Sequence, residues 1–377
     1  MVKKQFQNIQ LSRLGMGNMR LPTISGEPRS AIDYEKAQEI IDCAMENGIN
    51  YYDTAYTYPG SEEFLGQAMK KYPRDSYYLV TKYWIDANPD YAAVFEEQLR
   101  RLQTDHIDFY LIHSIMEGFG TVDQYIASGC IEYFIEQQKK GRITYLGFSS
   151  HAKPESLRRM ADYHKWDFAQ IQLNYLDWIF GTAKEEYEIL TEREIPVMVM
   201  ESIRGGKLAN LTDDLNEKLK AVHPDWSVAS WALRWLKRLP NVQVMLSGMS
   251  SMEQIQDNLS VFETDDSLSD DDTAFLEDVA RKYRNSFSVP CTGCRYCCEN
   301  CPQGLNIPKL MEIYNHYKYQ GYLTPPEILE IPEGQRPSDC LGCGKCMRHC
   351  PQTIQIPTLL KELDTVCERI LKTGERW

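Results

Sequence analysis

The sequence predicts an α/β fold in two parts: a closed barrel of eight strand–helix units and, after it, a smaller cysteine-rich domain. Two observations lead to this prediction. Strand-like and helix-like segments alternate through residues 1–285, and nine of the 12 cysteines are gathered between Cys291 and Cys350. A chain of 377 residues is long enough for one large domain and one smaller domain. We therefore expect the barrel to occupy residues 1–285 and the cysteine-rich domain to occupy residues 286–377.

The composition argues against several classes of protein. The chain has 41 Lys and Arg against 54 Asp and Glu, a net charge of −13, whereas a nucleic-acid-binding protein presents a basic surface. No apolar run approaches the roughly 20 residues that span a bilayer. The first 15 residues lack the apolar core of a signal peptide. We therefore expect a cytoplasmic protein that binds neither nucleic acid nor membrane.

The predicted strands are short and apolar, and a segment with apolar residues at helical spacing follows each of them. The first strand lies near Leu14, and the others cover residues 49–53, 77–82, 107–113, 145–149, 168–172, 197–200 and 242–246. The predicted helices cover residues 34–47, 61–71, 90–102, 122–140, 154–163, 184–193, 227–238 and 251–262. Gly48 stands where a helix C-cap is expected, and Ser61 stands where an N-cap is expected, ahead of acidic residues.

This alternation is typical of parallel strands joined by crossover helices. A barrel of eight such units needs about 250 residues, which the N-terminal part supplies. A doubly wound sheet is the alternative, but its glycine-rich phosphate fingerprint is missing after the first strand. There, Gly15-Met16-Gly17 lacks the third glycine and the helix that should follow. We therefore predict a (β/α)8 barrel, the TIM-barrel architecture.

Eight of the clustered cysteines form the pattern C-x2-C-x2-C-x3-C-P, which occurs twice, 49 residues apart. This duplication is typical of a bacterial ferredoxin with two 4Fe–4S clusters. A pair of zinc sites is the alternative, but zinc requires neither the third C-x2 step nor the repeated C-x3-C-P ending. Cys298 is left out of the ligand set because its counterpart in the second copy is Met347. We therefore predict a ferredoxin-like iron–sulfur domain at the C-terminal end of the chain.

In such ferredoxins the fourth cysteine of each run binds the other cluster. We therefore expect one cluster on Cys291, Cys294, Cys297 and Cys350, and the other on Cys340, Cys343, Cys346 and Cys301. After the second run, apolar residues recur at helical spacing between residues 359 and 371. We expect this last helix to dock the domain on the barrel. A helical stretch in the insert, residues 310–319, is expected to cover the barrel mouth or one cluster.

Polar side chains stand at the ends of the predicted strands, where barrel enzymes place their chemistry. They are Asp53, Lys82, His113, Ser149, Gln172 and Glu201. Tyr58 lies in the loop after the strand that ends at Asp53. A nearby cation favours the phenolate form of a tyrosine, so Tyr58 beside Lys82 is a candidate proton donor. We expect Asp53 to pair with Lys82, and His113 to orient a substrate carbonyl.

At these residues the sequence resembles the aldo/keto reductase family. The matching motifs follow one another in the family's order: residues 53–58, 60–62, 65–66, 81–82, 107–113, 141–143, 146–150, Gln172, residues 205–208 and Asn258. The resemblance covers about residues 5–262. It implies a (β/α)8 barrel that transfers hydride between a nicotinamide coenzyme and a carbonyl compound, or from an alcohol in reverse. The family's catalytic tetrad falls on Asp53, Tyr58, Lys82 and His113, with Tyr58 as general acid.

The resemblance also implies a coenzyme site. Its residues would be Gly17, Asn18, Met19, Asp53, Ser149, Ser150, Gln172, Met200, Arg204, Gly205, Gly206, Gly248, Gln254 and Asn258. Met200 replaces the aromatic residue that stacks on nicotinamide, and a thioether packs less rigidly on a ring. Gly248 and Gln254 replace the basic pair that binds the 2′-phosphate of NADPH. NADPH and NADH therefore both stay open, with FMN as an alternative.

The complete chain is similar to the ferredoxin-bearing branch of the family, which is typical of anaerobic bacteria and archaea. A hydride carries two electrons and a 4Fe–4S cluster carries one, so three functions are open. In the first, the barrel reduces a carbonyl with NAD(P)H, and the clusters transfer electrons or have a structural role. In the second, a flavin in the barrel connects substrate chemistry, through the clusters, to a redox partner protein. In the third, the barrel is degenerate and supports an electron-transfer module. The intact tetrad favours the first. The loop aromatics Trp84, Trp178, Phe119 and Phe180 suggest an apolar pocket wall.

Overall fold

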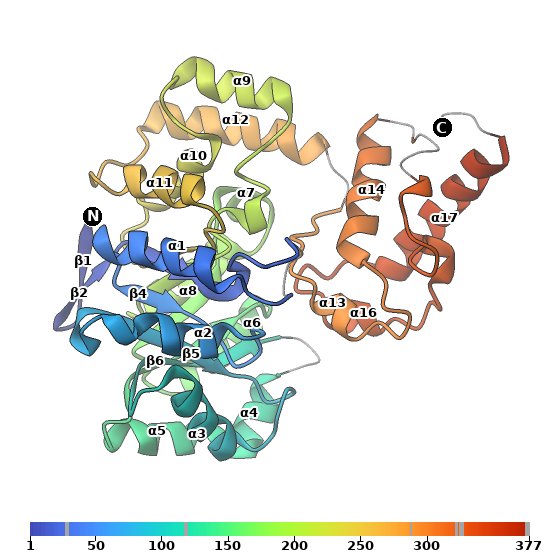
Figure 1. Ribbon diagram of the computed structural model, residues 1–377. Helices are drawn as coiled ribbons and strands as arrows, with labels where there is room; N and C mark the ends of the chain where they lie inside the picture. The colour runs from blue at the N-terminus through green and yellow to red at the C-terminus, as the bar shows by residue number, and fades with distance from the viewer. Residues whose placement is uncertain (27–29, 117–119, 287–288, 321–322, 324–327, 374–377) are drawn as a thin grey trace. The chain divides into compact units, whose positions relative to one another are not determined.

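The computed structural model describes residues 1–26, 30–116, 120–286, 289–320, 323 and 328–373, so Phe119 lies outside the described residues. The chain forms two compact units, whose helices and strands are shown in Figure 1. The barrel unit comprises Met1–Ile203 and Asp225–Thr273. The cysteine unit comprises Arg204–Pro224 and Ala274–Trp377. Each unit has its own buried core and is described by itself.

The barrel unit contains a closed barrel of eight parallel strands, which confirms the predicted fold class. The strands follow one another around the barrel in chain order, and the last pairs with the first. They are β3 (Leu14–Gly17), β4 (Tyr51–Asp53), β5 (Tyr78–Tyr83), β6 (Ile107–Ile115), β7 (Ile143–Ser150), β8 (Phe168–Gln172), β9 (Val197–Met200) and β10 (Val242–Ser247). Because the strands are parallel, their carboxyl ends share one end of the barrel.

Helices connect the barrel strands and lie outside them (Figure 1). They are α1 (Tyr34–Glu46), α2 (Ser61–Ala68), α3 (Tyr91–Leu102), α4 (Val122–Ser128), α5 (Cys130–Lys139), α6 (Pro154–Tyr163), α7 (Tyr175–Phe180), α8 (Ala183–Glu192), α10 (Val228–Leu236) and α11 (Met252–Val261). Helix α1 buries Ala37, Ile40, Ile41 and Ala44, a helical period of apolar residues. Gly48 follows it with φ of 83°, the left-handed conformation expected of a C-cap glycine.

Two details of the helix predictions are wrong. Residues 122–140 form two helices, α4 and α5, because Gly129 adopts φ of 75° between them and ends the first. Ser61 does not cap α2, since the N-cap position is taken by Gly60. Instead, the Ser61 hydroxyl donates to the carbonyl oxygen of Asn18 at 2.9 Å. The serine therefore ties α2 to the segment that follows β3.

An antiparallel hairpin precedes the barrel and was not predicted. It pairs β1 (Lys3–Phe6) with β2 (Ile9–Ser12). Phe6 and Leu11 belong to the same buried cluster as Tyr51 and Phe109 inside the barrel, and the rings of Phe6 and Phe109 are 5.4 Å apart. Tyr51 begins β4. The hairpin therefore covers the end of the barrel that lies opposite the carboxyl ends of the strands.

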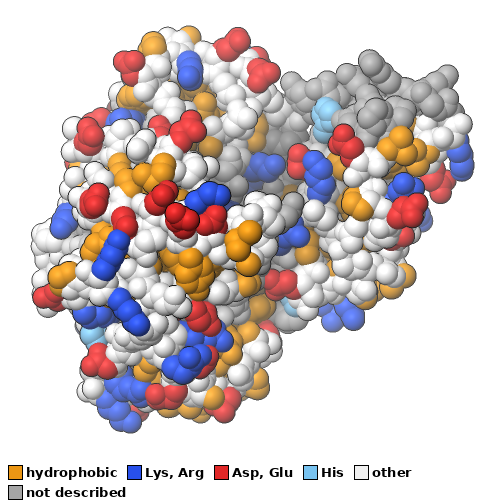
Figure 2. Space-filling model, viewed as in Figure 1, with side chains coloured by type: hydrophobic (Ala, Val, Ile, Leu, Met, Phe, Trp, Pro, Cys, Tyr) orange, Lys and Arg blue, Asp and Glu red, His pale blue; other side chains and the backbone are white. Residues whose placement is uncertain are grey.

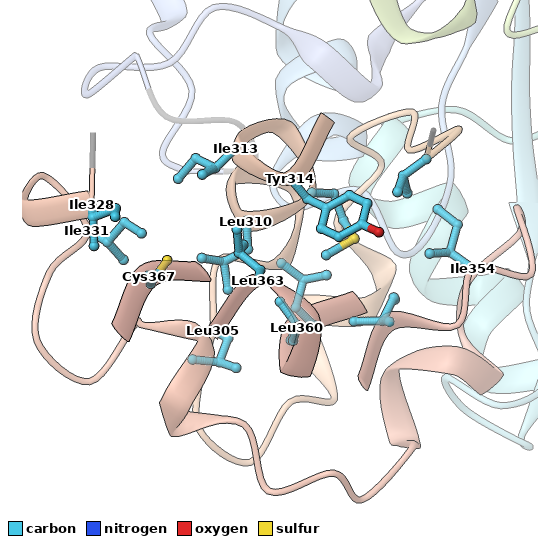
Figure 3. Close-up of a cluster of buried hydrophobic side chains, with 14 of the residues drawn as sticks. Leu305, Leu310, Ile313, Tyr314, Ile328, Ile331, Ile354, Leu360, Leu363 and Cys367 are labelled. Atoms are coloured by element: carbon cyan, nitrogen blue, oxygen red, sulfur yellow. The ribbon is translucent and has the colours of Figure 1, made fainter. Parts of the chain in front are cut away.

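The cysteine unit has one short helix within each cysteine run and a longer helix after each run (Figure 1). Its helices are α9 (Asp213–Val222), α13 (Tyr296–Glu299), α14 (Ile307–Gln320), α16 (Lys345–Arg348) and α17 (Ile356–Thr373), and α12 (Asp270–Ser286) runs into it from the barrel unit. Side chains of α14 and α17 meet in one apolar core, shown in Figure 3. The Tyr314 hydroxyl of α14 donates to the Glu362 carboxylate of α17 at 2.6 Å. The insert between the two cysteine runs is thus part of the unit's core.

The apolar face of α17 contains Leu360, Leu363, Cys367 and Ile370, all of which are buried. These residues belong to the core of the cysteine unit itself (Figure 3). The apolar residues that suggested a docking helix are therefore used within the unit, and docking of this helix on the barrel stays a prediction.

Among the helices of the described segments, none combines the length and the apolar character needed to cross a membrane. Acidic and basic side chains are interspersed on the face of the molecule shown in Figure 2. This mixture differs from the basic stripe that is typical of nucleic-acid-binding proteins.

Candidate active site

A buried ion pair lies at the carboxyl ends of β4 and β5. Lys82 Nζ donates to Asp53 Oδ1 at 2.6 Å and to the carbonyl oxygen of Thr54 at 2.6 Å. The Lys82 side chain is 1% exposed and the Asp53 side chain 5%. Burial raises the pKa of the Asp53 carboxyl and lowers the pKa of the Lys82 ammonium, and the attraction between the two groups opposes both shifts. The pair that the sequence predicted is present and shielded from water.

Tyr58 and His113 lie beside this pair. Lys82 Nζ is 5.2 Å from the centroid of the Tyr58 ring, and the rings of Tyr58 and His113 meet edge to face at 6.2 Å. Both side chains are largely buried, and the Trp84 ring lies 6.4 Å from the His113 ring. The structure therefore brings the four predicted residues together, with the Trp84 ring near the histidine.

The backbone around His113 is held by hydrogen bonds from two neighbouring elements. The Tyr125 hydroxyl donates to the His113 carbonyl oxygen at 2.5 Å. The next residue, Ser114, has φ of 55°, and its backbone N–H donates to Ser149 Oγ at 2.7 Å. A positive φ at a residue other than glycine costs free energy and persists only where surrounding contacts impose it. The end of β6 is therefore fixed in one conformation.

A second buried network of hydrogen bonds stabilises the carboxyl end of β5. Gln98 of α3 donates to Glu62 Oε1, to Thr81 Oγ1 and to the Lys82 carbonyl oxygen, at 2.9, 2.9 and 3.0 Å. Thr81 also donates to Glu62 Oε1 at 2.6 Å, and Arg101 forms an ion pair with Glu62 at 3.2 Å. The sequence suggested that Glu62 favours the start of a helix and belongs to a family motif, but not that it is part of a buried network. Its partners lie up to 39 residues away, so local pattern gave no sign of this network.

On the expected nicotinamide side of the barrel, several residues already have partners. Ser149 Oγ accepts from Ser114 N–H, and Ser150 Oγ accepts from Ala152 N–H at 3.1 Å. Each hydroxyl therefore still has a hydrogen to donate. Gln172 donates to Asp177 Oδ2 at 2.8 Å. The three residues line the carboxyl ends of β7 and β8, as expected. However, the Gln172 amide already uses part of its hydrogen-bonding capacity on Asp177.

The segment after β3 contributes Asn18, which is 1% exposed. Its side-chain N–H2 donates to the Asp53 carbonyl oxygen at 2.9 Å and to the Met16 carbonyl oxygen at 3.1 Å. Gly17 ends β3, and Met19 follows in a single 3₁₀ turn. Asn18 thus joins this segment directly to the strand that carries the buried ion pair.

The segment after β10 carries the residues expected at the adenosine phosphate. Gln254 Oε1 accepts from Ser250 N–H at 2.8 Å, and Asn258 donates to Ser247 Oγ at 2.9 Å. A Cβ added to Gly248 would meet only ordinary contacts, the nearest at 3.5 Å. Both amide side chains therefore support the turn between β10 and α11, and the positions contribute no positive charge.

Arg204, Gly205 and Gly206 follow β9 in sequence and belong to the cysteine unit. All three have positive φ, of 48°, 62° and 91°. Arg204 Nη2 lies 3.4 Å from Gln352 Oε1, which follows the second cysteine run. The residues predicted to meet a coenzyme phosphate are thus adjacent to a segment that carries cysteines.

The eight predicted ligands line two cavities in the cysteine unit. One cavity is lined by Cys291, Cys294, Cys297 and Cys350, and the other by Cys301, Cys340, Cys343 and Cys346. These are the two sets that crossed ligation requires. Met311 of the insert helix α14 lines the first cavity, so this helix covers one of the two predicted cluster sites.

Four thiols around each cavity fit the donor set of a 4Fe–4S cube. Left-handed residues shape both runs: Gly293 and Arg295 in the first, Gly342 and Gly344 in the second. Such turns let a short loop aim several thiols at one point. Within the described ranges, no group of three or more His, Cys, Asp or Glu is arranged to hold a single metal ion.

Two contacts at the barrel mouth were not predicted from the sequence: one of Arg20 with Glu201 and one of His151 with Gln172. Arg20 lies 3.7 Å from Glu201, which directly follows β9 and has φ of 56°. Burial lowers the pKa of His151 to about 4, and a hydrogen bond with Gln172 opposes this shift. His151 is therefore a neutral imidazole near pH 7. The sequence placed Glu201 at the end of a predicted strand, but Arg20 carried no recognisable signal.

Comparison with known proteins agrees with this geometry. The model of the aldo/keto reductase family matches residues 13–281, and the model of the 4Fe-4S dicluster domain matches residues 290–354. The chain is 28% identical to the uncharacterized oxidoreductase YqkF of Bacillus subtilis, over 67% of this chain and 87% of that protein. It is 25% identical to the NADH-specific methylglyoxal reductase of Escherichia coli, over 72% and 96%.

Among solved structures, the holo form of aldo-keto reductase AKR11C1 from Bacillus halodurans is similar, with a TM-score of 0.62 and 28% identity. The superposition covers 74% of this chain and 96% of that one. Each of these relatives is matched over most of its own length, whereas a quarter or more of this chain is left uncovered.

Proposed function

Because the chain belongs to the aldo/keto reductase family and carries a 4Fe-4S dicluster domain, we propose that its barrel reduces a carbonyl compound with hydride from NAD(P)H. The observation that carries this proposal is the buried corner formed by Asp53, Tyr58, Lys82 and His113. A scaffold without catalytic function has no use for a buried ion pair beside a tyrosine and a histidine. This argues against the degenerate-barrel alternative.

Tyr58 is the general acid in this proposal. Its hydroxyl gives a proton to the carbonyl oxygen as negative charge develops there, and the nearby Lys82 ammonium stabilises the phenolate that remains. Asp53 holds Lys82 in place through the 2.6 Å hydrogen bond. His113, whose backbone is fixed on both sides, orients the carbonyl. A nicotinamide coenzyme, when bound, supplies the hydride.

Among coenzymes, the residues favour NADH. Gly248 and Gln254 bring no cation to the position of a 2′-phosphate, and Gln254 Oε1 is already bonded to Ser250. The methylglyoxal reductase of Escherichia coli to which this chain is similar is NADH-specific. Ser149, Ser150 and Gln172 would hold the carboxamide, with Met200 against the ring. The small carbonyl substrate would enter past Trp84.

The flavin alternative has a specific basis, since Met200 and the missing cations weaken the nicotinamide site. The amides around Gly248 would then hold a flavin phosphate. Under either coenzyme we assign the two clusters to one-electron transfer with a partner protein, because the second cysteine run exposes Cys343 to solvent. A purely structural cluster needs no exposed ligand.

The test starts from protein purified without oxygen. We expect about eight irons per chain, no stoichiometric flavin in the supernatant after denaturation, and NADH oxidation that depends on an added aldehyde. One flavin per chain, with no aldehyde-dependent NADH oxidation, would replace this proposal by the flavin alternative. Stoichiometric zinc in place of iron would contradict the cluster assignment.

A further inference from the structure

The two cysteine runs are copies of each other, but their surroundings differ at matched positions. Thr292 in the first run is 4% exposed, whereas its counterpart in the second run, Leu341, is 63% exposed. Among the ligands, Cys343 is exposed, whereas its counterpart Cys294 is only partly so. Leu341 lines the cavity of Cys301, Cys340, Cys343 and Cys346, and the larger part of its side chain faces solvent beside it. The second run therefore offers an apolar contact next to a solvent-exposed ligand.

The charges at matched positions differ in the same direction. The short helix α13 of the first run begins with Tyr296 and ends with Glu299, whereas α16 of the second begins with Lys345 and ends with Arg348. Lys345 and Arg348 are both exposed. Neither has an ion-pair partner within the part of the chain that the structure describes. In a chain with net charge −13, this is a local positive surface.

The first run is covered by its own unit. Gln352, which lines the cavity of Cys291, Cys294, Cys297 and Cys350, lies 3.4 Å from Arg204. Arg295 donates to Asn306 Oδ1 at 3.2 Å, so the one basic residue inside the first run is engaged. Only the second run therefore combines an exposed ligand, an exposed apolar side chain and unengaged positive charge.

We propose that Leu341, Cys343, Lys345 and Arg348, here called the 341–348 surface, form the docking site for a one-electron carrier protein with an acidic face. Leucine supplies the apolar contact of a small transient interface, and the two cations steer the carrier to it. In each encounter one electron passes between the carrier and the cube on Cys301, Cys340, Cys343 and Cys346. One partner is oxidised and the other reduced, and no proton moves. The proposal rests on the assignment of the clusters to electron transfer.

The test uses the full chain with both clusters loaded, and a reduced acidic bacterial ferredoxin as the probe. Lys345→Glu/Arg348→Glu is compared with Lys361→Glu/Lys372→Glu, which makes the same charge change at exposed positions of α17. At low salt we expect the second-order rate of cluster reduction to fall at least about tenfold in the first variant. The control variant should stay within about twofold. The native rate should fall with added salt, and the salt dependence of the first variant should flatten or reverse.

Binding and cluster integrity separate this proposal from the proposed function. Binding of the oxidised ferredoxin should weaken in Lys345→Glu/Arg348→Glu and in Leu341→Ser, while the iron content and the rate of reduction by dithionite stay native. Equal ferredoxin rates in the native chain and the first variant would overturn the proposal, and so would an equal loss in the control variant. Aldehyde reduction by NADH is measured in parallel. Its failure would contradict the proposed function, whereas the docking proposal is judged by the ferredoxin measurements alone.

Discussion

In the barrel, four side chains from three strands and one loop meet in a buried corner, whereas in the cysteine unit each cavity takes three of its four thiols from a single run of seven residues. The Asp53–Lys82 pair has almost no contact with solvent. In the cysteine unit, by contrast, Cys343 is exposed. One site is assembled by the topology of the whole barrel, and the other by local spacing within a loop.

This difference matches the chemistry that we assign to each site. Hydride transfer with proton donation needs an environment without water, in which a buried charge acts strongly on the reacting group. One-electron transfer moves no atom, so a cluster can lie near solvent and near a partner. On this assignment, the difference between a buried barrel site and an exposed cluster ligand serves function. Each of the following predictions alters residues in either the barrel or the cysteine unit.

The largest effect is expected at the general acid. Tyr58→Phe removes the phenolic proton, and kcat for aldehyde reduction should fall by about 10²–10⁴-fold, the usual contribution of general acid catalysis. Tyr56→Phe is the matched control, because Tyr56 stacks on Arg101 at 4.6 Å, outside the tetrad. Both variants should keep native iron content. Near-native kcat in Tyr58→Phe would show that another group donates the proton.

The second effect concerns the crossed cavities. Cys291→Ala/Cys350→Ala removes two thiols from one cavity, so one intact cluster with about four irons should remain. Cys291→Ala/Cys301→Ala removes one thiol from each cavity, so neither cluster should keep its native signal. Electron paramagnetic resonance of the reduced protein distinguishes the two outcomes. Two altered clusters in the first variant, and an intact one in the second, would indicate that each run binds its own cluster.

The third effect tests burial of the ion pair. Asp53→Asn leaves the Lys82 ammonium without a carboxylate in a buried site, which should lower the free energy of unfolding by about 3–5 kcal/mol. Asp53→Asn/Lys82→Met removes both charges and should recover most of that loss. Urea unfolding followed by tryptophan fluorescence measures both variants. No difference between the single and double variants would mean that the pair is better solvated than the structure indicates.

The smallest effect concerns a buried carboxyl elsewhere in the barrel. Burial raises the pKa of Glu186 to about 7. Because the folded state then binds more protons than the unfolded state between about pH 4.5 and 7, stability falls as pH rises through this range. Glu186→Gln should remove this loss of stability, which amounts to up to about 3 kcal/mol at pH 8. At pH 4 the same substitution should change the free energy of unfolding little. Glu188→Gln, at an exposed position of the same helix, should leave the pH profile unchanged.

The two sites were predictable from the sequence for different reasons. The cysteine ligands follow from spacing alone, since three thiols per cavity lie within seven residues of one another. Asp53, Lys82 and His113 were predictable because each ends a predicted strand of a repeating strand–helix pattern, and parallel strands bring their ends together. Tyr58 needed the family motif as well, since a loop tyrosine has no periodicity.

What the sequence did not reveal depends on partners that are distant along the chain. The hairpin β1–β2 has four residues in each strand, too few for a clear alternation. The Glu62–Gln98 network and the Arg20–Glu201 contact join residues that only the closed barrel brings near each other. Gly129 was placed inside one helix because a single glycine in an apolar pattern does not show whether it takes a positive φ.

The central claim is that the barrel transfers hydride directly between nicotinamide and a carbonyl carbon. The most direct measurement uses NADH deuterated at C4, on the face that the enzyme uses, with an aldehyde in ordinary water. The account predicts that the alcohol product carries one carbon-bound deuterium, and that turnover slows with the deuterated coenzyme. An alcohol without deuterium, with the label in the solvent, would contradict the account, because it would mean that the hydrogen passes through an exchangeable site such as a flavin nitrogen.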